Sequence, residues 1–367
     1  MKRIMKRIVS LLAVGAIAIF VCSAVTMAAN TAAKPATTDA ATAQAAGPSG
    51  YHLIKTIPVP GDTGWDYLKF DPSTNHLFIS RGDHVAVVDI ESGKEVGDIG
   101  GMEGIHGIVL APEFNRGFVT DGRAAKVWIF DLKTLKVTGS AAAAPDADGE
   151  VYDPASKRVF TMNGDSKSST VIDAATGKVL GTIDLGGGPE FPVADGQGHI
   201  YANIETTSEI VEIDSNTMKI THRWPIAPGE SPSGLAMDTK NRILFSGCRN
   251  KMMAIVNADT GKVITTLPIG QGVDATRFDA GTGYAFASNG DGTLTVIHED
   301  SPTQFSVVEN VKTEERARTM ALDPATHRVF TVTAKFEPNP NAPANAPRYR
   351  RFRVVANTFH VLVFGKD

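Results

Sequence analysis

Short hydrophobic stretches alternate with polar turns from Tyr51 to the end of the chain, and this pattern recurs. Each unit has an anchor residue, usually Asp and often followed by Pro, then a polar turn and an apolar stretch that contains Phe or Tyr. Runs of about five residues rich in Val and Ile, bounded by Gly, Asp, Asn and Pro, are typical of β-strands. The anchors of the seven units are Asp71, Ala111, Asp153, Asp195, Asp238, Asp279 and Asp323.

A second motif follows each anchor and divides the unit further. It is an apolar stretch that ends near Asp and a turn such as S-G-K or T-G-K, as in V-V-D-I-E-S-G-K from Val87. Each unit therefore predicts four strands, named a to d, with strand a ending at the anchor. The anchors are 40 to 44 residues apart. That period with four strands predicts an all-β, seven-bladed β-propeller of four-stranded antiparallel blades. A helical solenoid is the alternative for a repeat, but no stretch after Tyr51 has a helical period.

The seventh unit ends before its outer strand. Its strand c is the terminal stretch F-H-V-L-V-F, and nothing after it matches a strand d. Leu53–Val59 near the other end of the domain is similar to the strand d that begins at Val263. We therefore expect the N-terminal strand to complete the last blade, since closure removes an open sheet edge.

The first 50 residues differ from the repeat. Four basic residues precede an apolar run from Ile8 to Val25, and Ala28 follows, which is typical of a secretory signal peptide over residues 1–28. Residues 29–50 contain no Leu, Ile, Val or aromatic residue before the folded part, so a disordered Ala/Thr-rich linker is expected. The domain would then span 51–367. The prediction is export to the periplasm, with no membrane span after cleavage.

Charge and cysteine content narrow the functional classes. The chain has a net charge of −4, and loss of four basic residues with the signal peptide would leave about −8. This disfavours extended nucleic-acid binding. Cys248 would be the only cysteine of the exported chain, and an inert thiol is the prediction for it. Catalytic motifs such as G-x-S-x-G, H-E-x-x-H or a P-loop are absent from suitable contexts.

The V-V-D-x-x-S-G-K and D-P-x-x-x-R-V-F motifs resemble those of the YVTN-type, YncE-like β-propellers of bacterial exported proteins. The resemblance extends from Tyr51 to Asp367 and includes D-P-A-T-H-R-V-F at Asp323. It implies an exported seven-bladed propeller that binds or scaffolds a partner. Repeat residues are mainly turn and core residues, so the resemblance defines the architecture better than the chemistry.

Candidate chemistry lies five residues before each anchor, where strand a begins and the mouth of the channel is expected. All seven residues there are polar, and Trp65 beside the first of them offers an aromatic wall. Carboxylates, a His and an Arg on one ring would hold a hard cation or a polar ligand. The alternative is that these positions are polar only because the channel mouth is hydrated, with no ligand bound. For Arg318, the alternative is an ion pair with a neighbouring carboxylate. The ring consists of Asp66, His106, Asp148, Glu190, Ser233, Asp274 and Arg318.

An insertion at 335–358 separates strands b and c of blade seven, and long loops in compact repeats are often functional. We expect it on the same face as the ring, as a lid, with its Pro-rich start unable to join a ladder. The opposite rim has short turns suited only to chain reversal. The candidate lid residues are Arg348, Tyr349, Arg350 and Arg351.

Two functions from different classes remain open. The first is a monomeric binding or scaffold module whose mouth face contacts a small molecule or a protein, without an identified cofactor. The second is a metal-assisted hydrolase or lyase, lactonase-like, in which Arg318 would bind an anion; a divalent metal is then the cofactor. The acid–base or metal residues of the second would be Asp66, His106, Glu190 and Asp274. A quinone-dependent dehydrogenase fits poorly, because the three Trp are scattered and no vicinal Cys pair exists.

Overall fold

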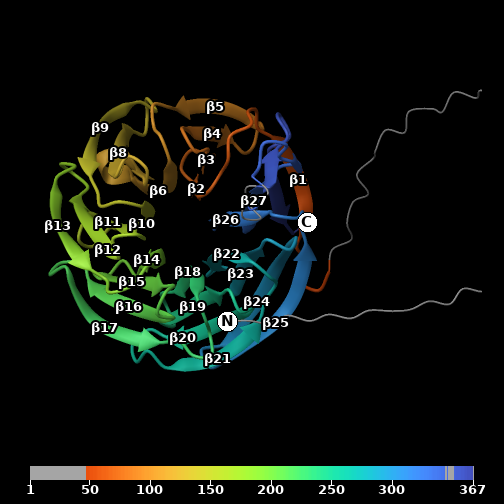
Figure 1. Cartoon of the computed structure of the whole chain (residues 1–367). Coiled ribbons are helices and arrows are strands. Elements are labelled where there is room, and N and C mark those ends of the chain that lie inside the picture. Colours follow the sequence, from red (N-terminus) through yellow and green to blue (C-terminus); the bar gives the residue numbers. More distant parts are fainter. Residues whose placement is uncertain (1–46, 344, 346–350, 367) are drawn as a thin grey trace, which may run out of the picture. The chain divides into compact units, whose positions relative to one another are not determined.

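The computed structural model describes residues 47–343, 345 and 351–366 of the chain. The predicted signal peptide and residues 29–46 of the predicted linker lie outside this part. Within it, seven four-stranded antiparallel sheets form a ring around a central channel (Figure 1). The prediction of an all-β, seven-bladed propeller is confirmed.

The first three blades follow one another along the chain, each running from an inner strand to an outer strand. Their strands are β2 (Leu68–Asp71), β3 (His76–Ser80), β4 (Val85–Asp89), β5 (Lys94–Ile99), β6 (Ile105–Ala111), β7 (Arg116–Asp121), β8 (Lys126–Asp131), β9 (Val137–Ala142), β10 (Ala147–Asp153), β11 (Arg158–Asn163), β12 (Ser168–Asp173) and β13 (Val179–Asp184). A 3₁₀ helix, η1 (Pro112–Phe114), replaces the usual turn after β6.

Blades four to six repeat the same order, and blade seven closes the ring. Their strands are β14 (Pro189–Ala194), β15 (His199–Ile204), β16 (Glu209–Asp214), β17 (Lys219–Pro225), β18 (Pro232–Asp238), β19 (Ile243–Cys248), β20 (Met252–Asn257), β21 (Val263–Pro268), β22 (Val273–Asp279), β23 (Tyr284–Asn289), β24 (Thr293–Ser301), β25 (Gln304–Lys312), β26 (Arg318–Asp323), β27 (Arg328–Thr333), β30 (His360–Gly365) and β1 (His52–Pro58).

Strand β1 is the outer strand of blade seven. It pairs antiparallel with the C-terminal strand β30, with Leu53 opposite Phe364 and Ile57 opposite Val361. The backbone N–H of Val59 extends this ladder by donating to the carbonyl of Phe359 at 3.0 Å. The predicted closure by the N-terminal strand is therefore confirmed, and both ends of the described domain lie in one sheet.

The recurring motif has two structural roles. The anchor carboxylate accepts hydrogen bonds from the turn that follows it, as Asp153 does from the backbone N–H groups of Ala155 and Ser156. Asp is suited to this position because its short side chain reaches the backbone two and three residues ahead. The aromatic residue of strand b packs in the core between blades and is almost fully buried in all seven: Phe78, Phe118, Phe160, Tyr201, Phe245, Phe286 and Phe330.

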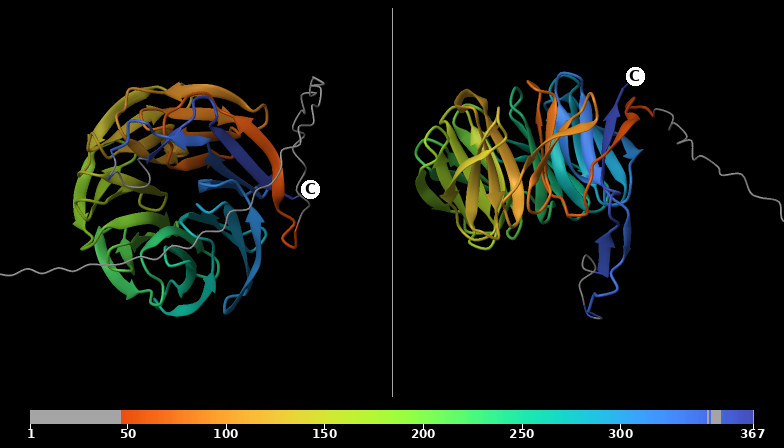
Figure 2. Two further views of the ribbon diagram at one scale, coloured as in Figure 1. Left: turned by 45° about the vertical axis from the view of Figure 1, so that its right-hand side comes forward. Right: turned by 90° about the horizontal axis from the view of Figure 1, so that it is seen from above.

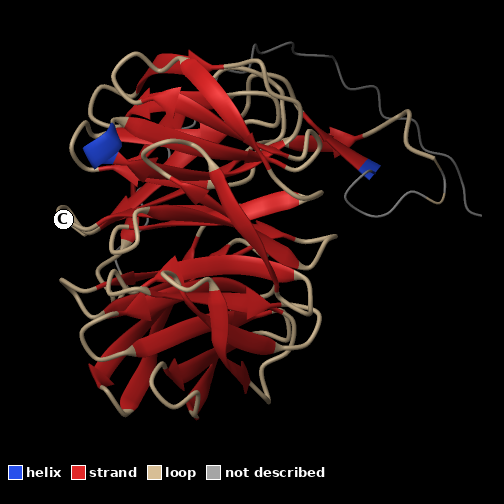
Figure 3. Ribbon diagram, turned by 90° about the vertical axis from the view of Figure 1, so that its left-hand side faces the viewer, coloured by secondary structure: helices blue, strands red, loops and turns tan. Residues whose placement is uncertain are grey.

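The insertion of blade seven forms a two-stranded hairpin, which extends from one face of the ring (Figures 2 and 3). Its strands are β28 (Phe336–Pro338) and β29 (Phe352–Val354). The expectation that the start of the insertion does not join a ladder was wrong, because Phe336 pairs with Val354 and Glu337 with Arg353. No helix in the described ranges is long and apolar enough to cross a membrane.

Candidate functional site

The seven ring positions lie where the innermost strands begin, and an irregular ladder sets their direction. The pairing of strands a and b shifts by a residue near this point in six of the seven blades. In β6 the shift lies between Ile105 and Ile108, and it therefore includes His106. A bulge interrupts the alternation of side chains along a strand and redirects one of them. This irregularity is repeated around the channel mouth.

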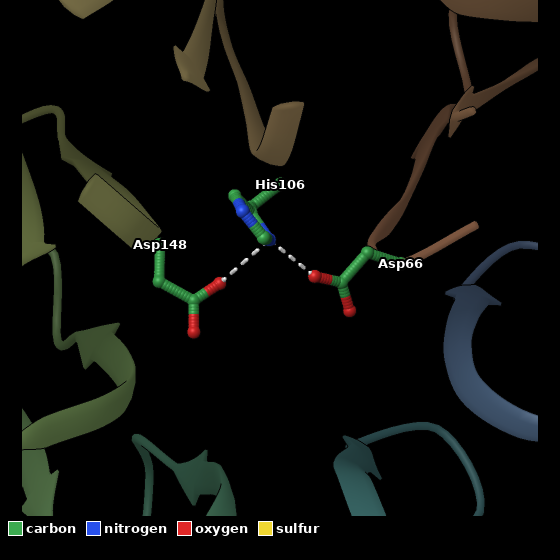
Figure 4. A group of neighbouring side chains, drawn as sticks. All are labelled: Asp66, His106 and Asp148. Carbon is green, nitrogen blue, oxygen red and sulfur yellow. Dashed lines mark hydrogen bonds and ion pairs between the residues drawn. The ribbon is translucent and has the colours of Figure 1, made fainter. Parts of the chain in front are cut away.

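Asp66, His106 and Asp148 come from three consecutive blades and point toward one another across the mouth (Figure 4). His106 Nδ1 lies 2.6 Å from Asp66 Oδ2 and 3.4 Å from Asp148 Oδ1. The three side chains are one quarter to one third exposed, so a solvent molecule or ligand can reach them. Three of the seven predicted ring residues thus form a compact carboxylate–imidazole–carboxylate group.

The pKa values of His106 and Asp148 in this group are strongly raised. Burial disfavours the charged imidazole of His106, but its hydrogen bond to Asp66 and the charge of Asp148 outweigh burial and raise its pKa to about 9. Burial and repulsion from Asp66 raise the pKa of Asp148 to about 7, although the positive charge of His106 opposes this. Near neutral pH the group therefore has a protonated imidazole, and Asp148 is close to its titration midpoint. Such values are frequent at functional sites.

The remaining ring residues form two further groups. Arg318 Nη1 donates to Asp274 Oδ1 at 2.8 Å, which is the ion pair considered as the structural alternative for this Arg. Ser233 is buried, and its hydroxyl donates to the backbone carbonyl of Asp274 at 3.1 Å. The structure therefore does not present Ser233 to the mouth as an open polar group.

Glu190 lies beside Arg249 and Glu205, two residues that sequence reasoning missed. Arg249 Nη2 is 3.5 Å from Glu190 Oε1, and its Nε is 2.9 Å from Glu205 Oε1. Burial and the adjacent carboxylates Glu205 and Asp148 raise the pKa of Glu190 to about 9. Both missed residues follow strand b of their blades, so a comparison of the b–c turns would have indicated them.

A pocket of about 620 Å³ opens at the mouth beside the His106 group. Trp65 lines it, and the indole also contacts Phe336 of the hairpin, with ring centroids 5.8 Å apart. The Trp65 Nε1 atom is buried and has no hydrogen-bond partner in the described residues. The ionisable residues of the pocket wall are Asp66, Glu103, His106, Arg123, Asp146, Asp165 and Arg318.

The hairpin lies on the mouth side, since Phe336 contacts Trp65. Arg316 fixes its base, with the guanidinium 4.2 Å from the ring centroid of Phe336 and 5.1 Å from that of Phe352. Of the candidate lid residues, Arg348, Tyr349 and Arg350 lie outside the described residues, and Arg351 is exposed next to β29. Lid function therefore stays a prediction.

The donor set fits a divalent cation. One ligand atom each from Asp66, His106 and Asp148 lies within 4.8 Å of the others, and carboxylate oxygens with an imidazole nitrogen are ligands for Mn²⁺ and Zn²⁺. Cation binding would require His106 to lose its proton. Cys248 cannot contribute: it is fully buried, and burial raises the pKa of its thiol to about 11.

Comparison with known proteins supports the fold alone. No family model matches the chain. No curated protein sequence matches it either. Among solved structures, it is similar to a chain in the crystal structure of a mitotic checkpoint complex, with a TM-score of 0.67 and 14% identity. The match covers 91% of this chain and 98% of the other. At this identity the similarity shows a shared β-propeller fold.

Proposed function

We propose that this chain is an exported, monomeric binding module of the YVTN, YncE-like type, located in the periplasm, which binds a small polar ligand at the channel mouth. The observation that carries this proposal is that Asp66 and His106 line a pocket of about 620 Å³, with Asp148 3.4 Å from His106 directly beside it. These residues come from separate blades, and burial of the Asp148 carboxyl, which raises its pKa to about 7, costs stability.

The charge of the pocket favours a ligand with a positive charge. Arg318 is neutralised by Asp274, and His106 by Asp66, so neither is available to bind an anion without losing its partner. Of the other ionisable wall residues, Glu103, Asp146 and Asp165 are acidic and Arg123 is basic. We therefore replace the anion-binding role considered for Arg318 with an ion-pair role, and propose an amine-bearing ligand.

A thermal-shift screen of primary amines, amino acids and amino sugars, followed by calorimetry of the hits, tests this proposal. We expect Asp146→Asn and Asp165→Asn to weaken a hit by about tenfold each, since each loses one charge-assisted contact. The matched control is Asp98→Asn, which removes an exposed carboxylate on the outer strand β5. Hits that bind both mouth variants as tightly as the control would contradict the proposal.

The Asp66–His106–Asp148 geometry favours a second candidate, a metal-assisted hydrolase or lyase. In this case the three residues would hold a divalent cation, which supplies a Lewis acid at the mouth. Metal analysis of the purified protein and calorimetric titration with Mn²⁺ discriminate between the two candidates. Stoichiometric metal that is lost in Asp66→Asn and His106→Gln supports the second candidate, whereas metal-independent amine binding supports the first.

A further inference from the structure

The inner strands depart from the repeat at six residues below the ring. Four residues before the anchor, most blades have Gly, Ala or Thr, and two residues before it, most have Val or Ala. The position between them is apolar in five of the seven blades. All of these positions lie along strand a, which lines the central channel. The residues that break the pattern are Tyr67, Phe191, Glu150, Thr276, Lys69 and Arg277.

Tyr67 and Phe191 divide the channel. Their rings stack with centroids 4.7 Å apart and planes at 30°. Tyr67 directly precedes β2 and Phe191 lies in β14, and these two strands face each other across the ring (Figure 1). The stacked pair therefore crosses the channel, with the mouth pocket on one side of it. A second cavity lies on the other side.

This lower cavity has a volume of about 610 Å³, which is enough for a small organic molecule. Its wall includes Val109, Val151 and Ala236 as apolar residues. The cavity extends to Pro154 and Pro324, which follow anchors in the turns of the opposite rim. A ligand would enter from that rim, which sequence reasoning had assigned to chain reversal alone.

Two cations line the lower cavity without a carboxylate partner. No ion pair of Lys69 or Arg277 is present within the described part of the chain. Arg277 Nη1 donates to the backbone carbonyl of Thr276 at 2.8 Å, and its guanidinium lies 5.7 Å from the ring centroid of Phe191. Burial, together with the charge of Arg277, lowers the pKa of Lys69. An anion bound between Lys69 and Arg277 would oppose both causes of this lowered pKa, because it would compensate the buried charge of Lys69 and the repulsion between the two cations.

Glu150 lines the same cavity and does not compensate these charges. It is 8% exposed, and neither carboxyl oxygen has a hydrogen-bond partner within the described ranges. Burial raises its pKa to about 8, so the group is mostly a neutral carboxylic acid at neutral pH. An unpaired buried carboxyl group is costly, and a ligand oxygen that accepts its proton in a hydrogen bond would satisfy it.

We propose that the lower cavity binds an organic anion with an apolar body, a carboxylate being the simplest case. Its charged group lies against Lys69 and Arg277, and its apolar part packs on Phe191 and the aliphatic wall. This site is separate from the mouth in position, in the sign of its charge and in its route of access. It goes beyond the function proposed for the mouth and does not depend on it.

Calorimetry of the folded chain with 2-naphthoate and with its neutral isostere 2-naphthamide tests the proposal. We expect 2-naphthoate to bind with Kd below about 1 mM and the amide to bind about tenfold more weakly or not at all. Lys69→Met and Arg277→Met should each weaken 2-naphthoate by about tenfold, while Arg277→Lys retains most of the affinity. Lys94→Met, which removes an exposed cation on β5, is the matched control and should bind like the unaltered chain.

Three outcomes would overturn the proposal. The first is no binding of 2-naphthoate by the unaltered chain, and the second is equal binding of acid and amide. The third is inorganic phosphate binding as tightly as 2-naphthoate, which would show that the cavity recognises charge without an apolar body. Loss of affinity in the Met variants counts only if their melting curves show a folded protein. Arg277→Lys provides the independent comparison if Arg277→Met does not fold.

Discussion

Arg81 shows how one side chain holds together the mouth side of the propeller. It is fully buried in the turn after β3 and donates to the backbone carbonyls of Pro60, Thr63 and Gly64 at 3.2 to 3.3 Å. Its guanidinium lies 3.8 Å from the ring centroid of Phe359. Burial lowers its pKa to about 10, so it remains charged at neutral pH. Arg81 thus connects the segment that leads into Asp66 with the last blade.

Arg81→Ala should lower the free energy of unfolding by about 2–4 kcal/mol, because three hydrogen bonds and a packed planar group are lost. Arg81→Lys should lose about half as much, since an ammonium cannot reproduce the planar fork. Chemical denaturation measures both. Arg123→Ala, in the corresponding turn of blade two and exposed, is the control and should change stability by less than about 0.5 kcal/mol. Equal losses for Arg81→Ala and Arg123→Ala would exclude this role.

Glu150 predicts a pH dependence of stability. Its pKa is about 8 in the folded chain against an ordinary value of 4.5, so the folded state binds the proton more tightly. Its contribution to stability is therefore complete below about pH 4.5 and is lost as the pH rises toward 8. Glu150→Gln cannot ionise, so its stability advantage over the unaltered chain should grow by a few kcal/mol between about pH 5 and 8. Urea denaturation at three pH values measures this.

Glu91→Gln, an exposed change on an outer turn, is the control and should show no such trend. A constant difference between Glu150→Gln and the unaltered chain at all three pH values would show that Glu150 is ionised in the folded state.

The sequence contained part of this residue-scale information. Repeat spacing identified the ring positions, but it could not show that His106 contacts both Asp66 and Asp148 or that Arg318 pairs with Asp274, because side-chain torsions decide these contacts. Lys69, Glu150 and Arg277 were detectable as departures from the repeat at channel positions. They lie outside the ring, which comprises a single position of each blade. No pattern indicated the burial of Arg81.

At the scale of elements, the repeat predicted all seven blades and the closing strand, since local turn chemistry and strand patterning agree with the fold. The insertion was less predictable. Its Pro-rich composition suggested an extended loop, yet Phe336 and Phe352 stack on Arg316 and allow a short ladder. Arg316, Phe336 and Phe352 are distant from one another in the sequence, so a local sequence pattern cannot predict that they pack together.

Closure of the ring predicts unequal effects of two Ile residues in β1. Ile57 is 1% exposed within the core between blades, whereas Ile54 in the same strand is 37% exposed. Ile57→Ala should lower the free energy of unfolding by about 2–4 kcal/mol through lost burial and a cavity. Ile54→Ala should lower it by less than about 1 kcal/mol. Thermal and chemical denaturation of both variants measure this, and equal effects would contradict packing of β1 in blade seven.

At the scale of the whole domain, the channel has two compartments of opposite charge. The mouth has an excess of carboxylates, and the lower cavity has Lys69 and Arg277, for which the described part of the chain provides no ion-pair partner. The Tyr67–Phe191 stack lies between them, and charges on the two sides still interact: burial lowers the pKa of Arg277 in the lower cavity to about 10, and the mouth carboxylate Asp274 opposes this shift. The arrangement favours cationic ligands from one face and anionic ligands from the other.

Excision of the hairpin tests whether the two compartments are independent. The backbone N–H of Val355 donates to the carbonyl of Lys335 at 2.9 Å, so a short Gly linker can replace residues 336–354 without displacing β27 or β30. The excision removes the contact of Phe336 with Trp65 in the mouth, and the residues that line the lower cavity among those described all lie outside the excised range. We expect the affinity of the mouth for amine hits to change and the free energy of unfolding to fall by less than about 2 kcal/mol. The affinity for 2-naphthoate should stay within about twofold of that of the unaltered chain.

Calorimetry with both ligand classes and a melting curve measure these effects. A tenfold loss of 2-naphthoate binding in a folded excision variant would show that the compartments are coupled across the Tyr67–Phe191 stack.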